Sequence, residues 1–352
     1  MELPRIAVGA LGGTIAMVRR GDDQGVSPAL AADDLVAAVP EIATVATVHT
    51  QTIANEPSPH LTFTHVYDAF CFATEQVEAG AVGVVLTHGT DTLEETAFAL
   101  DLLWNRPEPL IITGAMRNPD QPGADGPANL LGAVMTALSP HARDLGVLVV
   151  ANDEVHASRY VAKTDTSAVQ AFCSPGWGPL GRIIEGRVQI AFRPAAKSGV
   201  LPSFLTQPCA ATTMAHAAAD TPVNIPIIEL GLGDDGAYLP NLGQSGRVVI
   251  INAPGGGHMS PAAAERCIAL VDAGVPVIIA TRTGQGPTLN HTYGYVGAEI
   301  DLARRGMIFA GHLRARQARI LAHMFLASGG TPAALSRAYA VWGSAGFTTT
   351  GW

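Results

Sequence analysis

The sequence predicts an α/β protein built from two domains. Short runs of Val, Ile and Leu that are apolar throughout recur along the chain, each followed by a Gly- or Thr-rich turn and an Ala- and Leu-rich helical stretch. Strands without polar alternation are typical of a parallel sheet that is covered on both faces. A chain of 352 residues exceeds one typical hydrophobic core, which favours two domains over one.

Four strand–turn units are predicted in the first part of the chain. The strands cover 5–10, 83–86, 110–113 and 146–151, and a helix that ends at Leu103 follows the second strand. They lead into the turns Gly12-Gly13-Thr14, Thr87-His88-Gly89-Thr90, Gly114-Ala115-Met116 and Asn152-Asp153. We therefore expect residues 1–200 to form the larger, N-terminal domain, with a doubly wound, flavodoxin-like parallel sheet.

The pattern weakens after Arg193, where a segment rich in Pro, Ala and Thr replaces it. We expect a linker at 201–222. Strand-like runs at 223–230, 247–252 and 276–280 and helical stretches at 261–273 and 315–327 then indicate a smaller C-terminal α/β domain over 223–352.

Composition and charge exclude several classes of partner. The 30 acidic residues outnumber the 21 basic ones and no basic stripe is visible, so a nucleic-acid partner is not expected. The longest apolar runs are strand-length and the N-terminus lacks a basic, uninterrupted signal sequence, which predicts a cytoplasmic protein without a membrane span. The four cysteines form no CxxC or Cys/His cluster, so we expect buried thiols in a reducing compartment and no metal site.

The turns after parallel strands are where functional side chains gather, because the backbone N–H groups there are free. Taken alone, Gly12-Gly13-Thr14 is most simply a tight turn with a helix-capping threonine. The segment 87–95 carries more hydroxyl and carboxylate groups than capping requires, and N–H groups beside Gly89 and Thr90 are suited to stabilising an oxyanion. Lys163 is either a lysine that reaches solvent or a base beside a threonine.

Taken in order, five segments resemble the asparaginase/glutaminase family of bacterial type. They are LGGTIA at 11–16, THGTDTLEETAF at 87–98, TGAMR at 113–117, ADGPANL at 124–130 and NDEVHASRYVAKT at 152–164. These segments cover most of the first 200 residues, and the second domain resembles the family more loosely, through its layout and the run 299–319. LGGTIA followed by THGTDT is a specific pair that chance explains poorly.

The resemblance implies an amidohydrolase that cleaves the side-chain amide of asparagine without a metal or organic cofactor. Thr14 would be the nucleophile that forms a covalent acyl-enzyme, and Thr90, Asp91 and Lys163 would form a second cluster. In that cluster Lys163 would tune Thr90 for proton handling, and Asp91 would hold the substrate α-ammonium. Backbone N–H groups at Thr90 and near Ala115 would hold the oxyanion.

The resemblance further implies a homotetramer in which Glu299 of a neighbouring chain completes each active site. The family carries a tyrosine on the loop after GGTIA, and the corresponding stretch 17–28 contains none. Either another residue takes the proton of the nucleophile, or the enzyme is slower. The family asparagine in the second domain is also replaced, by Gly256 in the run 252–259.

The substrate-binding segment differs from the family as well. The family's Ser-Gln pair corresponds to Asn55 and Glu56, with Ser58 as a rival for the serine. A glutamate near Asp91 adds negative charge to the pocket, from which we expect an altered substrate preference. A glutaminase or another small-amide or lactam hydrolase is therefore an alternative, and so is a non-catalytic amino-acid-binding protein.

Overall fold

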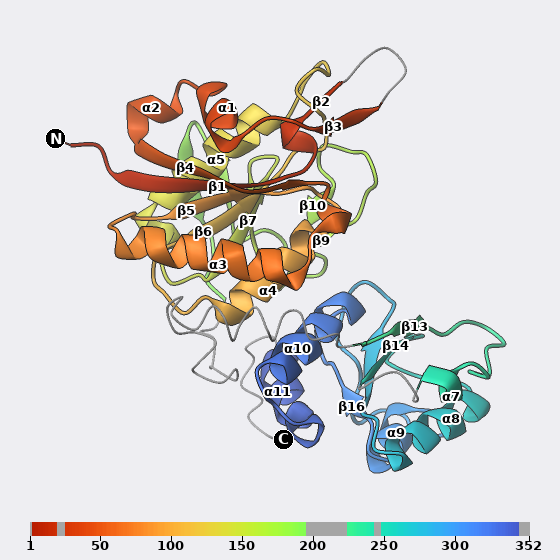
Figure 1. Ribbon diagram of the computed structural model, residues 1–352. Helices are drawn as coiled ribbons and strands as arrows, with labels where there is room; N and C mark the ends of the chain where they lie inside the picture. Colours follow the sequence, from red (N-terminus) through yellow and green to blue (C-terminus); the bar gives the residue numbers. More distant parts are fainter. Residues whose placement is uncertain (1, 20–24, 195–223, 243–247, 345–352) are drawn as a thin grey trace. The chain divides into compact units, whose positions relative to one another are not determined.

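The structure is a computed structural model that describes residues 2–19, 25–194, 224–242 and 248–344 (Figure 1). The described residues divide into two compact units, one within 2–194 and one within 224–344. The predicted linker at 201–222 lies outside the described residues. In the described part of the chain, no helix is long and apolar enough to span a bilayer.

An eight-stranded sheet with the order β12-β11-β8-β7-β6-β5-β1-β4 forms the centre of the first unit. Its strands are β1 (Arg5–Gly12), β4 (Thr47–Glu56), β5 (Val84–Thr87), β6 (Leu110–Thr113), β7 (Val147–Ala151), β8 (Glu154–Ala157), β11 (Gly181–Ile184) and β12 (Arg187–Ile190). Strands β4, β1, β5, β6 and β7 run parallel, and β8, β11 and β12 extend the sheet antiparallel. Numbered along the chain, the parallel strands have the order 2-1-3-4-5, which is the flavodoxin-like arrangement and confirms the predicted fold class.

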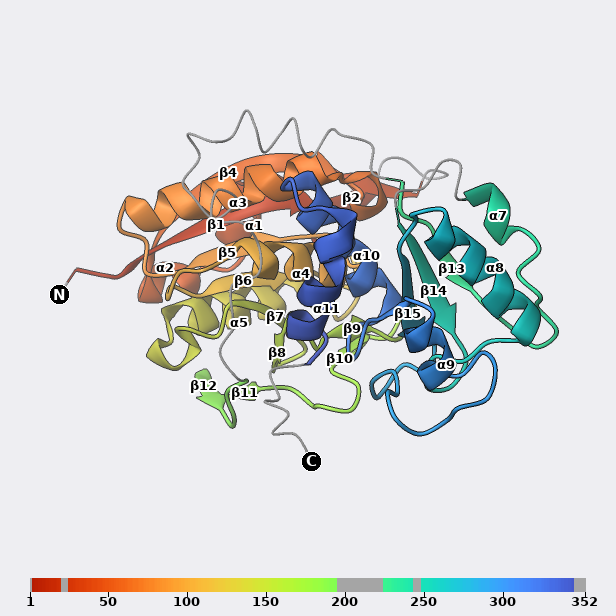
Figure 2. The same cartoon turned by 90° about the horizontal axis from the view of Figure 1, so that it is seen from below.

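Helices cover both faces of this sheet (Figures 1 and 2). α3 (Phe63–Glu78) and α4 (Leu93–Leu103) lie along one face, and α1 (Ala32–Ala37) and α5 (Gly126–Leu138) along the other. This double cover explains why β5, β6 and β7 are buried at every residue and apolar except for the last residue of β5 and of β6, which is threonine. Shorter elements are η1 (Thr14–Ala16), α2 (Ile42–Val45), η2 (Ser58–His60), η3 (Pro140–Ala142) and the strand pairs β2 (Met17–Arg19) with β3 (Val26–Pro28) and β9 (Ala162–Lys163) with β10 (Phe172–Cys173).

Three of the strands that the sequence does not reveal, β4, β11 and β12, lie away from the buried centre of the sheet. β4 has the sequence TVHTQTIANE, and none of its residues is fully buried. It pairs with β1 at the edge of the sheet, where a strand has one neighbour and needs no continuous apolar run. The antiparallel strands β11 and β12 are likewise mostly exposed or half-buried, so the pattern of apolar runs misses them.

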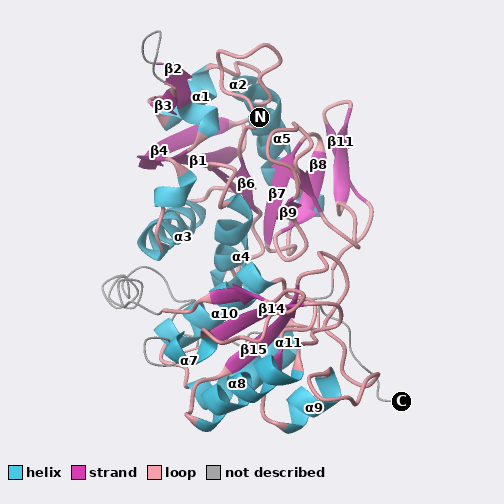
Figure 3. Cartoon of the chain, turned by 90° about the vertical axis from the view of Figure 1, so that its right-hand side faces the viewer, coloured by secondary structure: helices cyan, strands magenta, loops and turns pink. Residues whose placement is uncertain are grey.

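The second unit contains a smaller, wholly parallel sheet with the order β13-β14-β15-β16. Its elements are β13 (Ile227–Glu229), α7 (Leu239–Leu242), β14 (Val249–Ala253), α8 (Pro261–Asp272), β15 (Val277–Thr281), α9 (Glu299–Arg304), β16 (Ile308–Phe309), α10 (Ala315–Ala327), η6 (Pro332–Ala334) and α11 (Leu335–Trp342). α8 and α10 lie on opposite faces of this sheet (Figure 3). The apolar side of α8 packs with β14 and β15 into one core, so the predicted α/β domain is confirmed.

The cysteines depart from expectation at one position. Cys71 on α3 is disulfide-bonded, whereas Cys173 and Cys267 carry free thiols. The expectation of a free thiol is therefore wrong at Cys71. Sequence spacing does not reveal such a bond, because disulfides depend on the distance between Cα atoms in the fold and not on separation along the chain.

Buried histidines make the fold sensitive to acid. Burial lowers the pKa of His88 and His156 from 6.5 to about 4, and burial likewise lowers the pKa of His323 in the second unit to about 4. A histidine with a depressed folded-state pKa binds its proton more readily when the chain is unfolded. Its contribution to stability is therefore full above pH 6.5 and is lost as the pH falls toward 4.

We expect the unfolding temperature to fall between about pH 7 and about pH 4.5, because a shift of this size corresponds to about 3 kcal/mol for one fully buried histidine. Thermal unfolding followed by circular dichroism at both pH values measures the effect. His156→Gln should reduce the fall relative to the unmodified chain. An unfolding temperature that is constant over this range would contradict the assignment of neutral, buried histidines.

Candidate active site

β1 and β5 end side by side at the place where the strand order of the first sheet reverses. β1 pairs with β4 on one side and with β5 on the other. Ligands of open α/β sheets bind outside the carboxyl ends of the strands at such a switch point. Thr14 follows β1 and Thr90 follows β5, so both predicted catalytic threonines lie at the switch point.

The two turns that carry these threonines touch through glycines. Gly12 and Gly13 have φ values of 95° and 85°, which residues with a side chain rarely adopt. A Cβ atom on Gly13 would lie 2.1 Å from the Cα of Gly89, so no side chain fits between the turns. Thr14 and Thr90 are the residues directly after Gly13 and Gly89, and this contact therefore brings them together.

Thr14 opens η1 and is half-buried. The preceding turn is held by the N–H of Gly13, which donates to the carbonyl oxygen of Glu56 at 3.1 Å. No other residue in the described part of the chain forms a hydrogen bond with the Thr14 hydroxyl. The turn thus presents a hydroxyl on a fixed backbone, which is what a nucleophile requires.

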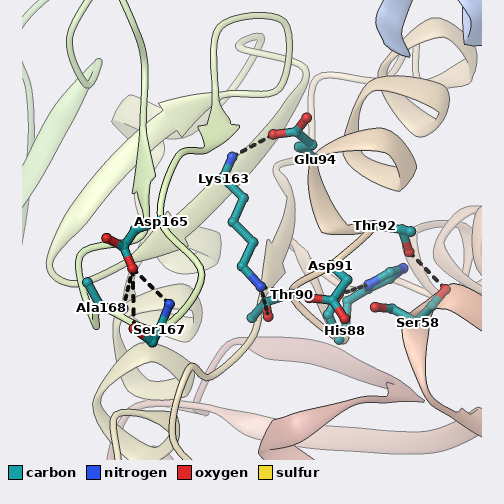
Figure 4. A network of polar contacts seen from close by, with 11 residues as sticks. Ser58, His88, Thr90, Asp91, Thr92, Glu94, Lys163, Asp165, Ser167 and Ala168 are labelled. Atoms are coloured by element: carbon teal, nitrogen blue, oxygen red, sulfur yellow. Dashed lines mark hydrogen bonds and ion pairs between the residues drawn. The ribbon is translucent and has the colours of Figure 1, made fainter. Parts of the chain in front are cut away.

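Lys163 joins the second threonine to a carboxylate (Figure 4). Its ammonium nitrogen Nζ donates to Thr90 Oγ1 at 2.9 Å and to Asp91 Oδ1 at 2.8 Å. The side chain of Lys163 is 16% exposed and that of Asp91 is 63% exposed, so the ion pair extends from the protein interior to solvent. Thr90 itself is buried. The structure therefore brings the predicted cluster of Thr90, Asp91 and Lys163 together.

Glu94 positions Lys163, a role that the sequence did not suggest. Its buried carboxylate accepts the backbone N–H of Lys163 at 2.5 Å. Glu94 lies in the first turn of α4, where an acidic side chain interacts favourably with the helix dipole. Because this explains Glu94 from the sequence alone, the contact with Lys163 was not predicted. After Lys163, the chain turns at Asp165, whose carboxylate accepts the N–H groups of Ser167 and Ala168 at 2.8 Å each (Figure 4).

A buried histidine orients the peptide bond between Gly89 and Thr90. Burial lowers the pKa of His88 to about 4, so its ring is neutral at pH 7. Nδ1 of His88 lies 2.7 Å from the carbonyl oxygen of Gly89, and since a carbonyl only accepts, Nδ1 carries the proton. The C=O and N–H of a trans peptide point in opposite directions. The N–H of Thr90 therefore points away from the buried His88.

The third turn is built in the same way. Nδ2 of Asn129 donates to the carbonyl oxygen of Gly114 at 2.9 Å, which directs the N–H of Ala115 the opposite way. Asp125 holds the residues that follow by accepting the N–H groups of Met116 and Arg117 at 2.9 Å and 2.8 Å. The N–H groups of Thr90 and Ala115 have no acceptor within the described ranges, so both can serve an oxyanion.

The structure separates the three candidates of the substrate-binding segment. Asn55 and Glu56 are exposed at the end of β4, and the Glu56 carboxylate lies 3.4 Å from Nδ1 of His60. Ser58 is buried against the second turn, where a Cβ atom on Gly89 would lie 2.9 Å from Ser58 Oγ. Thr92 Oγ1 donates to the carbonyl oxygen of Ser58 at 2.9 Å (Figure 4). By position, Ser58 is the better candidate for the family's serine.

Glu299 belongs to the second unit and is fully buried there. Its carboxylate accepts the N–H groups of Thr292 and Tyr293 and lies 3.0 Å from Nε2 of His258. The sequence predicts that Glu299 enters the active site of a neighbouring chain. Its carboxylate is already engaged in these hydrogen bonds within its own unit. The glycine at the family's asparagine position has a packing reason, because a Cβ atom on Gly256 would lie 2.5 Å from Leu289 Cγ.

No group of three His, Cys, Asp or Glu side chains suited to a metal ion occurs among the residues that the structure describes. The features of the site are instead two hydroxyls, one ammonium group, one exposed carboxylate and two free N–H groups. This set fits acyl transfer by a hydroxyl nucleophile.

Two models of known protein families match this chain. The family model described as "Asparaginase, N-terminal" matches residues 5–196, and that described as "Glutaminase/Asparaginase C-terminal domain" matches residues 224–339. The chain belongs to the asparaginase family. It is accordingly an amidohydrolase of the L-asparaginase type.

Individual members of the asparaginase family are similar over nearly the whole chain. A probable L-asparaginase of Deinococcus radiodurans is 36% identical over 339 residues, which is 96% of this chain and 98% of that protein. A glutaminase-asparaginase of Pseudomonas fluorescens is 32% identical and covers 92% of this chain and 87% of its own length. The crystal structure of a probable cytoplasmic L-asparaginase from Campylobacter jejuni superposes with a TM-score of 0.82 at 28% identity, covering 96% of this chain and 99% of that one.

Gly13→Ala should force the two turns apart. The substitution combines an unfavourable φ with a Cβ atom that would overlap Gly89, so we expect destabilisation of more than about 2 kcal/mol and loss of most amidohydrolase activity. Gly80→Ala is the matched control for backbone strain, because Gly80 has φ 94° with no atom within 4 Å of an added Cβ. Gly25→Ala, also in open space, controls for the substitution itself.

The three variants are compared by chemical denaturation, which gives the free energy of unfolding, and by the rate of ammonia release, which gives the activity. Destabilisation by Gly13→Ala that equals that of Gly80→Ala, together with full activity, would show that the glycine contact does not hold the site.

Proposed function

We propose that this chain hydrolyses the side-chain amide of L-asparagine to L-aspartate and ammonia, with Thr14 as nucleophile. The observation that carries the proposal is the pair of threonines at the switch point. The hydroxyl of Thr14 has no hydrogen-bond partner among the described residues, and that of Thr90 is bound by Lys163. The names of the Deinococcus and Pseudomonas relatives support an amino-acid amide as substrate. Amide hydrolysis needs a nucleophile, a proton route and an oxyanion site, because the leaving group departs as ammonia.

In the proposed first step the Thr14 hydroxyl attacks the amide carbon. The N–H groups of Thr90 and Ala115 stabilise the negative charge that develops on the amide oxygen. Thr90 passes its hydroxyl proton to the amide nitrogen and is reprotonated by the proton that Thr14 gives up. The nitrogen then leaves as ammonia, and an ester between Thr14 and the aspartyl group is formed. In the second step water attacks this ester, L-aspartate is released and Thr14 regains its proton.

Thr90 handles protons in this proposal. The Lys163 ammonium group has three donors and no acceptor, so in the contact with Thr90 Oγ1 the lysine donates. The hydroxyl proton of Thr90 is therefore directed elsewhere and is available to the leaving nitrogen. Glu94 supports the arrangement by fixing the backbone of Lys163.

Asp91 is the proposed group for the substrate α-ammonium. Its carboxylate is more than half exposed and shares one oxygen with Lys163, which leaves the other oxygen for a cationic ligand. Ser58, which follows β4 and packs on Gly89, is proposed to contact the substrate from the same carboxyl edge of the sheet. Asn55 and Glu56 contribute only if their exposed side chains turn toward the bound substrate.

Two rival functions use the same residues. The relative named glutaminase-asparaginase favours L-glutamine or another small amide or lactam as an alternative substrate. A non-catalytic amino-acid-binding protein would keep Asp91 but would not need Thr14 together with Lys163. We favour the enzyme on that ground.

Assembly and location are part of the proposal only. A homotetramer with Glu299 shared between chains stays a prediction, and the engagement of the Glu299 carboxylate inside its own unit weighs against it. A cytoplasmic location is supported by the name of the Campylobacter protein. The disulfide at Cys71 weighs in the other direction, because disulfides are rare in reducing compartments.

Thr14→Ala should reduce the rate of ammonia release from L-asparagine by at least about 10⁴-fold, because the variant lacks the attacking oxygen. Binding of L-aspartate, measured by calorimetry, should be retained. Thr47→Ala, at an exposed position of β4, is the control and should keep full activity. If the wild-type chain binds L-aspartate but releases no ammonia from any amide, the non-catalytic reading is correct.

Glu56→Gln tests substrate preference. Removing a negative charge near the pocket should change the ratio of kcat/KM for L-asparagine and L-glutamine by about tenfold, equivalent to about 1.4 kcal/mol. Ammonia release is measured for both amino acids, their D-enantiomers and N-acyl amides, with Glu41→Gln at another exposed site as control. If the wild-type chain hydrolyses L-asparagine with ordinary efficiency, and Glu56→Gln leaves that efficiency unchanged, the hypothesis of an altered substrate preference is wrong.

A further inference from the structure

An apolar pocket opens in the first unit between α1, α5 and the residue that follows Thr14. Both helices lie on the same face of the large sheet (Figure 1). The empty space of the pocket, its open mouth included, is about 400 Å³, which is within the usual size range of ligand pockets. The larger apolar side chains of its wall are Ile15, Leu30, Leu35, Val39 and Leu130.

The wall of this pocket offers hydrogen bonds at one position only. Among the described residues, Arg117 is its one member with a polar side chain, and the others are Ile, Leu, Val, Ala, Pro or Gly. Water in such a space finds few partners, so an apolar group that displaces it binds favourably. We call this space the Arg117 pocket.

The guanidinium group of Arg117 is held in place on one side. Its Nη1 donates to the carbonyl oxygens of Gly123 at 3.1 Å and of Pro122 at 3.4 Å. The residue is exposed, so the group lies where the pocket meets solvent. Within the described ranges, its Nε and Nη2 groups have no hydrogen-bond acceptor, and no carboxylate forms an ion pair with it.

The two acids of the same loop are engaged elsewhere. The carboxylate of Asp120 accepts the N–H of Arg19 at 3.2 Å. That of Asp125 accepts the backbone N–H groups of Met116 and Arg117 at 2.9 Å and 2.8 Å. The positive charge at the pocket is therefore left for a ligand.

The free edge of the guanidinium selects the chemistry of that ligand. The N–H groups of Nε and Nη2 point in parallel, and their spacing matches the two oxygens of a carboxylate. An inorganic anion would satisfy this edge but would leave the apolar wall uncovered, and a plain hydrocarbon would leave the charge unpaired. A carboxylate on a compact apolar body satisfies both.

The proposed amide hydrolysis gives the Arg117 side chain no role. Arg117 belongs to the segment TGAMR, in which Gly114 and Ala115 form the turn of a candidate oxyanion N–H. That turn is held by Asn129 and Asp125, and only the backbone N–H of Arg117 takes part. The fixed guanidinium group thus needs another explanation.

We infer that the Arg117 pocket binds a small monocarboxylic acid with a compact apolar body, such as an arylalkanoate. The carboxylate pairs with Arg117, and the hydrocarbon packs between α1 and α5, against Leu35 and Leu130. The inference goes beyond the proposed amide hydrolysis, because it uses none of the hydroxyl, ammonium or carboxylate groups of that site and involves no chemical step.

The test measures binding of hydrocinnamate, a phenyl ring on a propionate, to the full-length chain by isothermal titration calorimetry. Excess L-aspartate is present, so that the threonine site is occupied. Hydrocinnamyl alcohol has the same ring without the charge, and propionate has the charge without the ring. We expect one hydrocinnamate per chain, bound at least about tenfold more tightly than either of these.

Two substitutions, each with a matched control, locate the site. Arg117→Gln should weaken the binding of hydrocinnamate by at least about tenfold, because a charge-assisted hydrogen bond is lost. Arg187→Gln, at an exposed arginine of β12, should leave it within about twofold. Ala38→Phe places a ring on the wall of the pocket and should weaken binding by at least about tenfold. Ala37→Phe, at the exposed neighbouring position, is its control.

Binding that is lost with Arg117→Gln and Ala38→Phe and kept by both controls supports the assignment. It would be overturned by absence of binding to the wild-type chain, by an alcohol that binds as tightly as the acid, or by unchanged affinity in either pocket variant. Thermal unfolding shows that each variant is folded. Failure of the amide hydrolysis would be seen separately, as absence of ammonia release from the wild-type chain.

Discussion

The contact between Gly13 and Gly89 is the constraint on which the candidate active site depends. The two glycines meet at the carboxyl ends of neighbouring parallel strands, and a Cβ on Gly13 would lie 2.1 Å from the Cα of Gly89. Because the chain order reverses between these strands, the turns are free of crossing helices and can approach each other. Thr14 and Thr90 are placed by this approach. The hydroxyl groups of the two threonines supply the chemistry, but their proximity comes from two glycines, which have no side chain.

A second device in the fold sets the direction of the backbone around the site. His88 holds the carbonyl of Gly89, and Asn129 holds the carbonyl of Gly114, each at hydrogen-bond distance. Since the peptide group is planar, fixing one end of it fixes the direction of the other. Both candidate oxyanion N–H groups are thus oriented by buried polar side chains. The sequence motifs THGTDT and ADGPANL contain these residues, which gives a physical reason for more than the threonines in them.

The sequence predicted the centre of the fold and a cluster of residues, Thr90, Asp91 and Lys163, that the structure brings together. It missed contacts that depend on distance in space. Apolar runs marked β5, β6 and β7 because helices cover both faces. β4, β11 and β12 were missed because edge and exposed strands have no such run. The bond from Glu94 to Lys163 spans 69 positions and was hidden by an adequate local explanation of Glu94. Ser58 and Glu56 differ by two positions, and only the strand end separates a buried residue from an exposed one.

Asp91 in the first unit and Glu299 in the second unit differ in exposure and in their hydrogen-bond partners. In the first unit, Asp91 is exposed and shares its carboxylate with Lys163, so it suits an ammonium ligand. In the second unit, Glu299 is buried, and its carboxylate accepts two backbone N–H groups and lies within hydrogen-bond distance of His258. The expectation that both acids surround one ligand came from resemblance. Their environments differ: Asp91 is more than half exposed, whereas Glu299 is fully buried within its own unit.

Covalent trapping tests the central claim most directly. The wild-type chain is mixed with L-asparagine, quenched in acid within milliseconds and digested. The masses of the peptides are then measured by mass spectrometry. The account predicts an aspartyl ester on Thr14 that is absent from Thr14→Ala and from unreacted protein. An ester on Thr90 in place of Thr14, or steady ammonia release with no adduct on any threonine, would contradict it.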